Sequence, residues 1–151
     1  MVNLLVTEKK WHDSLFESLI NWSGEDSWIR IDNIDGFNFK NIKKLKINKI
    51  FIPHWSFIIP RMIYENYECI LFHMTDLPFG RGGSPLQNLI KNGYNQTKIS
   101  AFRVNNELDA GPIYLKKDLC LQGNARSIFN EASFIINEMI IEIIENELTP
   151  I

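Results

Sequence analysis

The residues best suited to chemistry stand in one stretch of the chain and in a turn that follows it. The stretch from His73 to Gln87 joins an imidazole, a glycine-rich loop and a helix start. The later turn, Glu-Leu-Asp-Ala-Gly-Pro at 107–112, contributes the carboxylate of Asp109. An imidazole with a carboxylate nearby can move protons and stabilise developing negative charge. We therefore expect a catalytic site.

Asp109 has two roles that the sequence alone leaves open. Its side chain can close an Asx turn within the Leu-Asp-Ala-Gly-Pro segment. It can also pair with His73 and favour the imidazolium, which then donates to an oxyanion, and it can take a proton from an attacking amine. Only the second role requires the two side chains to meet in the fold.

The composition of the chain excludes several classes of protein. Its 151 residues predict one domain, 1–151, and 45% hydrophobic with 23% charged residues indicate a globular protein. With a net charge of −2, no bulk field attracts nucleic acid or an anionic membrane. No apolar run approaches the roughly 20 residues of a membrane span, and the N-terminus lacks a signal-peptide pattern. We expect a cytoplasmic protein without nucleic-acid or membrane partners.

The cysteines and histidines show no metal-binding pattern. Cys69 and Cys120 lie far apart in apolar segments, so we expect two buried, reduced thiols. The three histidines, at 12, 54 and 73, have no ligand-like spacing. The sequence therefore predicts no metal ion.

Alternating strand and helix patterns predict the elements that must position the chemical residues. Strands are expected at 2–7, 28–31, 47–52, 69–72, 97–104 and 112–121, and helices at 11–22, 58–65, 84–91 and 125–147, whereas 32–44 has no clear pattern. At the third helix, Ser84 and Gln87 predict a capping box around Pro85. The order predicts an α/β, Rossmann-like fold: a mainly parallel sheet covered by helices on both faces, with a C-terminal β-hairpin and a long closing helix.

The ends of two consecutive predicted strands carry histidines. His54 follows the strand at 47–52, and His73 follows the strand at 69–72. In open α/β sheets the functional crevice lies at the carboxyl ends of the strands. We therefore expect both histidines near one crevice.

The order of motifs after these strands supports a family resemblance. The residues concerned are His73, Leu77, Pro78, Gly82, Pro85, Asp109 and Gly111. In order and spacing they resemble the signature of the folate-dependent formyltransferases, which is Asn-x-His-Pro-Ser-Leu-Leu-Pro, a glycine-rich loop and then Asp-x-Gly. That family contains glycinamide ribonucleotide, methionyl-tRNA and sugar-nucleotide N-formyltransferases. The resemblance runs from about residue 50 to residue 125 and is poor before residue 46.

The resemblance implies a reaction and roles for several residues. A formyl group would pass from 10-formyltetrahydrofolate to a primary amine through a tetrahedral intermediate, with His73 stabilising the oxyanion and Asp109 handling protons. The residues implied to hold the pteridine in an apolar slot are Trp55, Phe57, Ile58, Glu107 and Leu108.

Departures from the family pattern raise a second possibility. The asparagine of the signature, which helps polarise the formyl oxygen, is Leu71 here, and leucine donates no hydrogen bond. Our hypothesis is that His54 supplies the missing donor, while a purely structural His54 remains an alternative. If nothing replaces the asparagine, the chain is a non-catalytic folate- or sugar-nucleotide-binding relative. Asp76 stands where the family has leucine, and it can bind a substrate amine or satisfy loop amides.

The acceptor is inferred mostly from what the family pattern lacks here. No glycine-rich phosphate loop follows the first strand, and the chain ends after its long helix, so no RNA-binding domain is expected. A nucleotide-linked amino sugar is then the expected acceptor, another small amine remains possible, and a homodimer is left open. An unrelated nucleotide-binding module is disfavoured because Gly-x-Gly-x-x-Gly is missing. The candidate substrate contacts are Lys9, Lys10, His12, Asp76, Arg81, Gly82 and Gly83.

Overall fold

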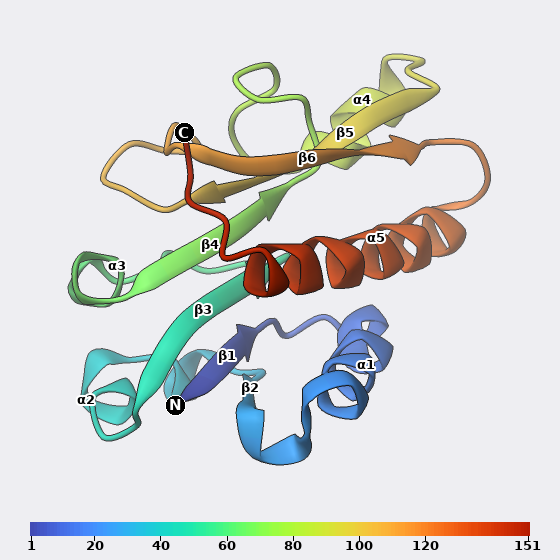
Figure 1. Cartoon of the computed structure of the whole chain (residues 1–151). Coiled ribbons are helices and arrows are strands. Elements are labelled where there is room, and N and C mark those ends of the chain that lie inside the picture. Colours follow the sequence, from blue (N-terminus) through green and yellow to red (C-terminus); the bar gives the residue numbers. More distant parts are fainter.

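A six-stranded sheet lies at the centre of the molecule, with helices on both faces (Figure 1). The computed structural model describes all residues, 1–151. The strands are β1 (Val2–Val6), β2 (Trp28–Ile31), β3 (Ile47–Pro53), β4 (Glu68–His73), β5 (Gln96–Arg103) and β6 (Ile113–Cys120). Their spatial order is β2-β1-β3-β4-β5-β6, with β1 to β4 parallel and β5 and β6 forming an antiparallel hairpin. The predicted sheet is thus confirmed.

Two apolar clusters hold the helices on the sheet. The five helices are α1 (Asp13–Ser23), α2 (Phe39–Ile42), α3 (Arg61–Asn66), α4 (Pro85–Lys91) and α5 (Ala125–Glu145), with single 3-10 turns at Lys10–His12, Glu25–Ser27 and Ile34–Gly36. The larger cluster joins α1, α4 and α5 to one side of the sheet, and the smaller joins α2 and α3 to the other. No helix combines the length and the apolar character needed to cross a membrane.

The register of the central strands places the predicted crevice. β3 and β4 run parallel, with Ile52 opposite Leu71 and Pro53 opposite Phe72. The two strands therefore end at the same level, and the residues that follow them emerge at one edge of the sheet.

Several local predictions were wrong for identifiable reasons. The helix expected at 58–65 begins only at Arg61, because a residue before proline disfavours helical backbone and Pro60 itself is extended (ψ 137°). Ser84 makes no side-chain cap: its left-handed backbone (φ 52°) is not the extended conformation that a capping side chain needs. Cys69 is buried as expected, but Cys120 is exposed at the end of an edge strand.

Candidate active site

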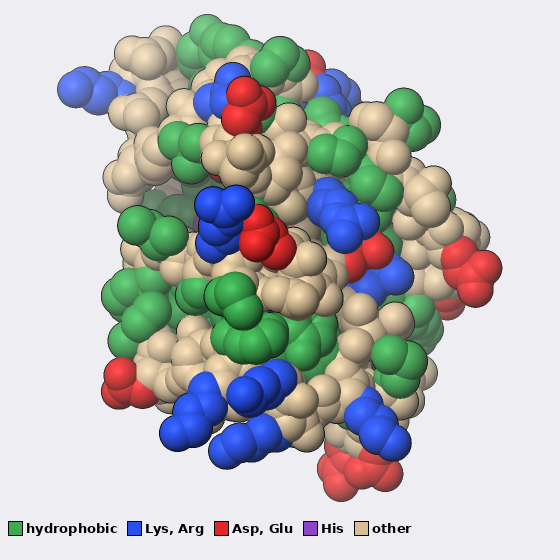
Figure 2. Space-filling model, turned by 90° about the vertical axis from the view of Figure 1, so that its left-hand side faces the viewer, with side chains coloured by type: hydrophobic (Ala, Val, Ile, Leu, Met, Phe, Trp, Pro, Cys, Tyr) green, Lys and Arg blue, Asp and Glu red, His purple; other side chains and the backbone are tan.

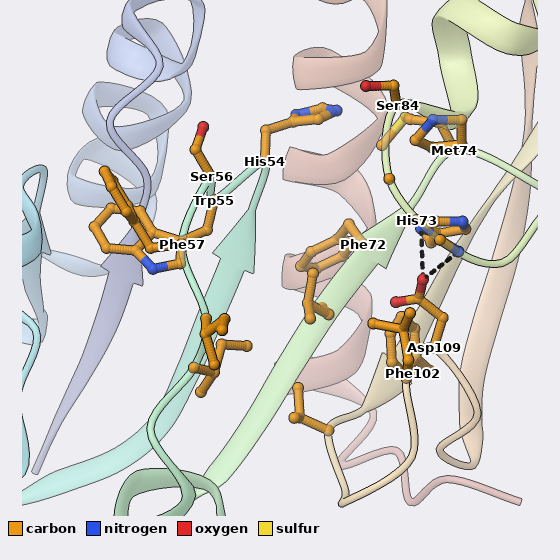
Figure 3. Close-up of a pocket in the computed structure, with 18 of the residues that line it drawn as sticks. His54, Trp55, Ser56, Phe57, Phe72, His73, Met74, Ser84, Phe102 and Asp109 are labelled. Carbon is orange, nitrogen blue, oxygen red and sulfur yellow. Dashed lines mark hydrogen bonds and ion pairs between the residues drawn. The ribbon is translucent and has the colours of Figure 1, made fainter.

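A cavity of about 840 Å³ opens at the carboxyl ends of β3 and β4 (Figure 3). Its lining includes the three predicted catalytic residues His54, His73 and Asp109. The tertiary structure therefore brings together residues from the ends of two strands and from the turn after β5. This cavity is the candidate active site.

His73 is anchored through one ring nitrogen. Its Nε2 lies 2.7 Å from the carbonyl oxygen of Gly80, and because a carbonyl only accepts, Nε2 must donate. Neutral His73 therefore has a free lone pair on Nδ1, and any second proton goes there. Nδ1 lies 3.7 Å from Oδ2 of Asp109, which is an ion-pair distance once the imidazole is protonated. The carboxylate thus lies on the side of the His73 ring that would carry a second proton.

Backbone groups fix Asp109 in place. The amide of Gly82 donates to its Oδ2 at 2.8 Å, so the glycine-rich loop and the carboxylate hold each other. Asp109 adopts a left-handed conformation (φ 50°). A Cβ at Gly111 would lie 1.6 Å from the carbonyl oxygen of Arg103, so only glycine allows this turn to approach the end of β5.

Arg81 secures the same turn from outside. Its Nε and Nη2 both donate to the carbonyl of Leu108, at 2.9 and 2.6 Å. Arg81 was expected to contact a substrate phosphate, but the structure uses its guanidinium as a clasp on the turn, and the residue does not line the cavity. Gly82 and Gly83, predicted with it, do line the cavity.

An aromatic and apolar wall faces the His73–Asp109 pair. Trp55 and Phe57 lie across the cavity from His73 and Asp109 (Figure 3), and their rings pack edge to face at 5.1 Å. All five residues predicted to hold a pteridine line the cavity: Trp55, Phe57, Ile58, Glu107 and Leu108. Leu71 lines it too, two residues before His73 on the same strand. The wall suits a flat ring, and Leu71 offers it no hydrogen bond.

A second histidine pair lies at the same edge of the sheet. Nε2 of His12 is 2.8 Å from Nδ1 of His54, and the two rings stack at 5.0 Å. Nδ1 of His12 is 2.8 Å from the hydroxyl of Ser133 on α5. Burial, then repulsion between the rings, lowers the pKa of His12 to about 2, and burial lowers the pKa of His54 to about 4. Both imidazoles are therefore neutral at pH 7.

Two predicted substrate contacts lie elsewhere. His12 is completely buried behind His54, so it cannot reach a substrate phosphate. Asp76 lies outside the cavity and pairs with Lys116, whose hydrogen bond lowers the pKa of the Asp76 carboxyl. Among the remaining candidates, Lys9 lines the cavity and Lys10 does not.

The sequence prediction also missed residues that belong to the site. Trp11, Gln87 and Phe129 line the cavity, and Ser133 supports His12 from behind. Ser133 carried a signal, since it is a polar residue beside Ala132 and Ile136 on the buried face of α5. Trp11 carried none, because a tryptophan near a helix start reads equally well as core.

A group of basic side chains lies away from the cavity. Figure 2 looks at the side that carries α2 and α3, and it shows Lys and Arg side chains at its lower edge beside an apolar area. The exposed lysines on and after α2 are Lys40, Lys43, Lys44 and Lys46, and none of them lines the cavity.

Comparisons with known proteins agree with the geometry, although no family model matches the chain. A methionyl-tRNA formyltransferase of Rickettsia prowazekii (strain Madrid E) is 33% identical over 109 residues, which are 70% of this chain and 36% of that protein. The chain thus spans about a third of the length of the curated relatives it matches.

Solved structures extend the likeness over the whole chain. The methionyl-tRNA formyltransferase from Clostridium thermocellum superposes with a TM-score of 0.93 at 43% identity, covering 99% of this chain and 67% of that one. The formyltransferase PseJ from Anoxybacillus kamchatkensis, in complex with UDP-4,6-dideoxy-4-formamido-L-AltNAc and tetrahydrofolate, superposes with a TM-score of 0.68 at 18% identity, covering 99% and 80%, which shows a shared fold. Given 43% identity over nearly its full length and the same fold, this chain belongs to the formyltransferase family.

Proposed function

We propose that the protein transfers a formyl group from 10-formyltetrahydrofolate, the donor substrate, to a primary amine. The observation that carries this proposal is the His73–Asp109 pair, at 3.7 Å, facing an aromatic wall across one cavity. The wall accommodates the flat pteridine, and the pair stands where charge and protons must be managed. Family membership supports the same reaction.

The two polar residues divide the chemistry between them. As the amine nitrogen bonds to the formyl carbon, the formyl oxygen gains negative charge, which a proton on Nδ1 of His73 stabilises. Asp109 takes the proton that the amine nitrogen loses, directly or through water. The bond from the formyl carbon to the folate nitrogen then breaks, and that nitrogen regains a proton. His73 keeps Nε2 on Gly80 throughout, so its ring does not turn.

For the acceptor we propose a nucleotide-linked amino sugar. Trp11 offers an aromatic ring at the cavity, and Nζ of Lys9 lies 5.6 Å from the centre of that ring. A sugar hydroxyl can accept from Nε1 of Trp11, which has no partner, while the Lys9 ammonium, 3.3 Å from Glu8, meets a phosphate. Methionyl-tRNA is the second candidate acceptor, because the relatives that are 33% and 43% identical are methionyl-tRNA formyltransferases.

A binding titration followed by a turnover assay tests this proposal. The purified protein is titrated with 5-formyltetrahydrofolate, and 10-formyltetrahydrofolate is then offered with nucleotide-linked amino sugars or with methionyl-tRNA. Saturable binding and release of tetrahydrofolate with a sugar support the proposal, whereas release with methionyl-tRNA alone replaces the acceptor. Folate binding without turnover on any acceptor indicates the non-catalytic relative. Absence of folate binding overturns the proposal.

A further inference from the structure

Apart from a proton on Nδ1 of His73, the strand that ends at His73 supplies no side-chain hydrogen-bond donor to the cavity. Nε2–H of His73 is committed to Gly80, and Leu71, on the same strand, has no polar group. Three other lining residues carry buried ring nitrogens without any partner: Trp11 (Nε1), His54 (Nε2) and Trp55 (Nε1). A buried unpaired donor costs about 1–3 kcal/mol, so these groups are suited to a ligand that accepts hydrogen bonds.

His54 differs from the two tryptophans because its backbone and its ring are both held. The residue adopts a left-handed conformation (φ 53°), which is uncommon outside glycine, and Thr7 donates to its carbonyl at 3.2 Å. Its ring packs edge-on against the stacked rings of Trp11 and Phe129, with a centroid separation of 5.8 Å to each. In Figure 3 the imidazole extends toward the side of the cavity that carries His73 and Met74.

The hydrogen bonds behind His54 can run in two directions, and only one of them pairs every hydrogen once an acceptor oxygen lies at Nε2 of His54. The Ser133 hydroxyl bonds to no group in the structure except His12. If it donates to Nδ1 of His12, then Nε2 of neutral His12 donates to Nδ1 of His54. Neutral His54 must then carry its hydrogen on Nε2. That Nε2–H has no partner within the protein, so it is completed only by a ligand acceptor. The opposite direction would leave the hydroxyl hydrogen buried and unpaired even with a ligand present, and it would turn a lone pair of Nε2 toward the ligand oxygen.

We propose that Ser133, His12 and His54 form a directional hydrogen-bond relay that makes His54 a permanent donor into the cavity, where its Nε2–H binds an oxygen atom of the reacting pair. That oxygen belongs either to the formyl group or to the acceptor, and its identity rests on the proposed function. The tautomers of His12 and His54 in the relay do not depend on the proposed function. Because the pKa of His54 is lowered to about 4 by burial, the ring stays a neutral donor across the physiological range.

Histidine NMR tests the relay without any reference to catalysis. The chain has three histidines, so substituting each in turn assigns every imidazole signal. Nitrogen-15 spectra at pH 7 are expected to show His12 and His54 as Nε2–H tautomers, and His54 is expected to stay neutral down to about pH 5. Ser133→Ala removes the hydroxyl that sets the direction and should populate the Nδ1–H tautomer of His54. An Nδ1–H or charged His54 in the unmodified protein overturns the relay.

Kinetics identify the oxygen that the donor serves. If it is the formyl oxygen, His54→Ala lowers kcat about 10²–10³-fold with little change in KM, as for other lost oxyanion donors. If it is an acceptor oxygen, KM for the acceptor rises and kcat is kept. His54→Gln, whose amide can reach the Nε2 position, should restore part of either loss, with circular dichroism confirming folding. If kcat and KM are unchanged in His54→Ala, the donor role is overturned. If the unmodified protein shows no turnover at all, that result counts only against the proposed function.

Discussion

Two histidine pairs stand at the same edge of one sheet and have opposite electrostatic surroundings. His73 faces the carboxylate of Asp109 at 3.7 Å, at the lining of the cavity. The side-chain hydrogen-bond partner of His54 is a second imidazole, that of His12, which is completely buried. A carboxylate stabilises an imidazolium, whereas burial beside a neutral ring prevents one. The first pair can therefore exchange a proton, and the second remains neutral.

The difference arises from the elements that reach each strand end. β3 and β4 are neighbouring parallel strands. His54 directly follows β3, and His73 is the last residue of β4. The turn after β5 brings a carboxylate to one of them, while α5 and the 3-10 turn Lys10–His12 bring a hydroxyl and an imidazole to the other. The same residue type at equivalent strand ends thus acquires two distinct roles.

Removing the carboxylate of Asp109 should have the largest effect, because that carboxylate distinguishes the His73 pair from the His54 pair. Asp109→Asn keeps the size of the side chain but removes its charge, so the attacking amine loses its proton acceptor. We expect kcat to fall about 10²–10⁴-fold, the usual contribution of a positioned acid or base. Release of tetrahydrofolate measures the loss, and titration with 5-formyltetrahydrofolate checks that the cavity still binds. Turnover within a few-fold of the unmodified protein would rule out this role for Asp109.

Lowering the pH should reduce the stability of the fold through the second pair, His12 and His54. The unfolded chain protonates His12 and His54 near pH 6.5, whereas the folded chain holds their pKa values at about 2 and about 4. As pH falls below 6.5, the unfolded state therefore binds more protons, and the free energy of unfolding decreases down to about pH 4 for His54 and further for His12. The expected slope is about 1.4 kcal/mol per pH unit for each group.

Urea unfolding at pH 7 and pH 5 measures this effect. His12→Asn removes one of the two titrating rings, so its loss of stability between the two pH values should be clearly smaller than that of the unmodified protein. Equal losses in both proteins would mean that His12 is not held neutral in the fold.

Removing the contacts of Arg81 with the turn that carries Asp109 should reduce activity only slightly. Arg81→Ala removes two hydrogen bonds to the carbonyl of Leu108, while Gly82 still holds Asp109. Because Gly82 still holds Asp109, we expect the loss to be about that of one net hydrogen bond, 0.5–1.5 kcal/mol, which lowers kcat/KM about 2–13-fold. Arg81→Lys serves as the matched control and should lose less. Steady-state kinetics of both variants measure the effect. Equal activity of the unmodified protein, Arg81→Ala and Arg81→Lys would show that Arg81 does not position the site.

Most of the fold was legible in the local pattern of residues. The run 47–52 and the run 69–72 are apolar enough to be buried strands, and the long apolar stripe after Ala125 predicted α5. Errors arose where backbone geometry overrides residue preference. Pro60 delayed α3, and the left-handed backbone of Ser84 removed its cap. Such angles depend on how the flanking segments are fixed, which a local pattern does not contain.

The candidate active site was also predicted only in part from the sequence. Residue types and their order singled out His73 and Asp109, because imidazole, carboxylate and glycine in that sequence suit few tasks other than chemistry. The loop at 55–58 was implied by the family resemblance. Chain folding alone decided the distance between His73 and Asp109, the use of Arg81 as a clasp and the burial of His12 against Ser133. Ser133 lies 121 residues beyond His12 along the chain. A contact of that range exists only after α5 has packed on the sheet, so only the tertiary structure could assign His54 its partners.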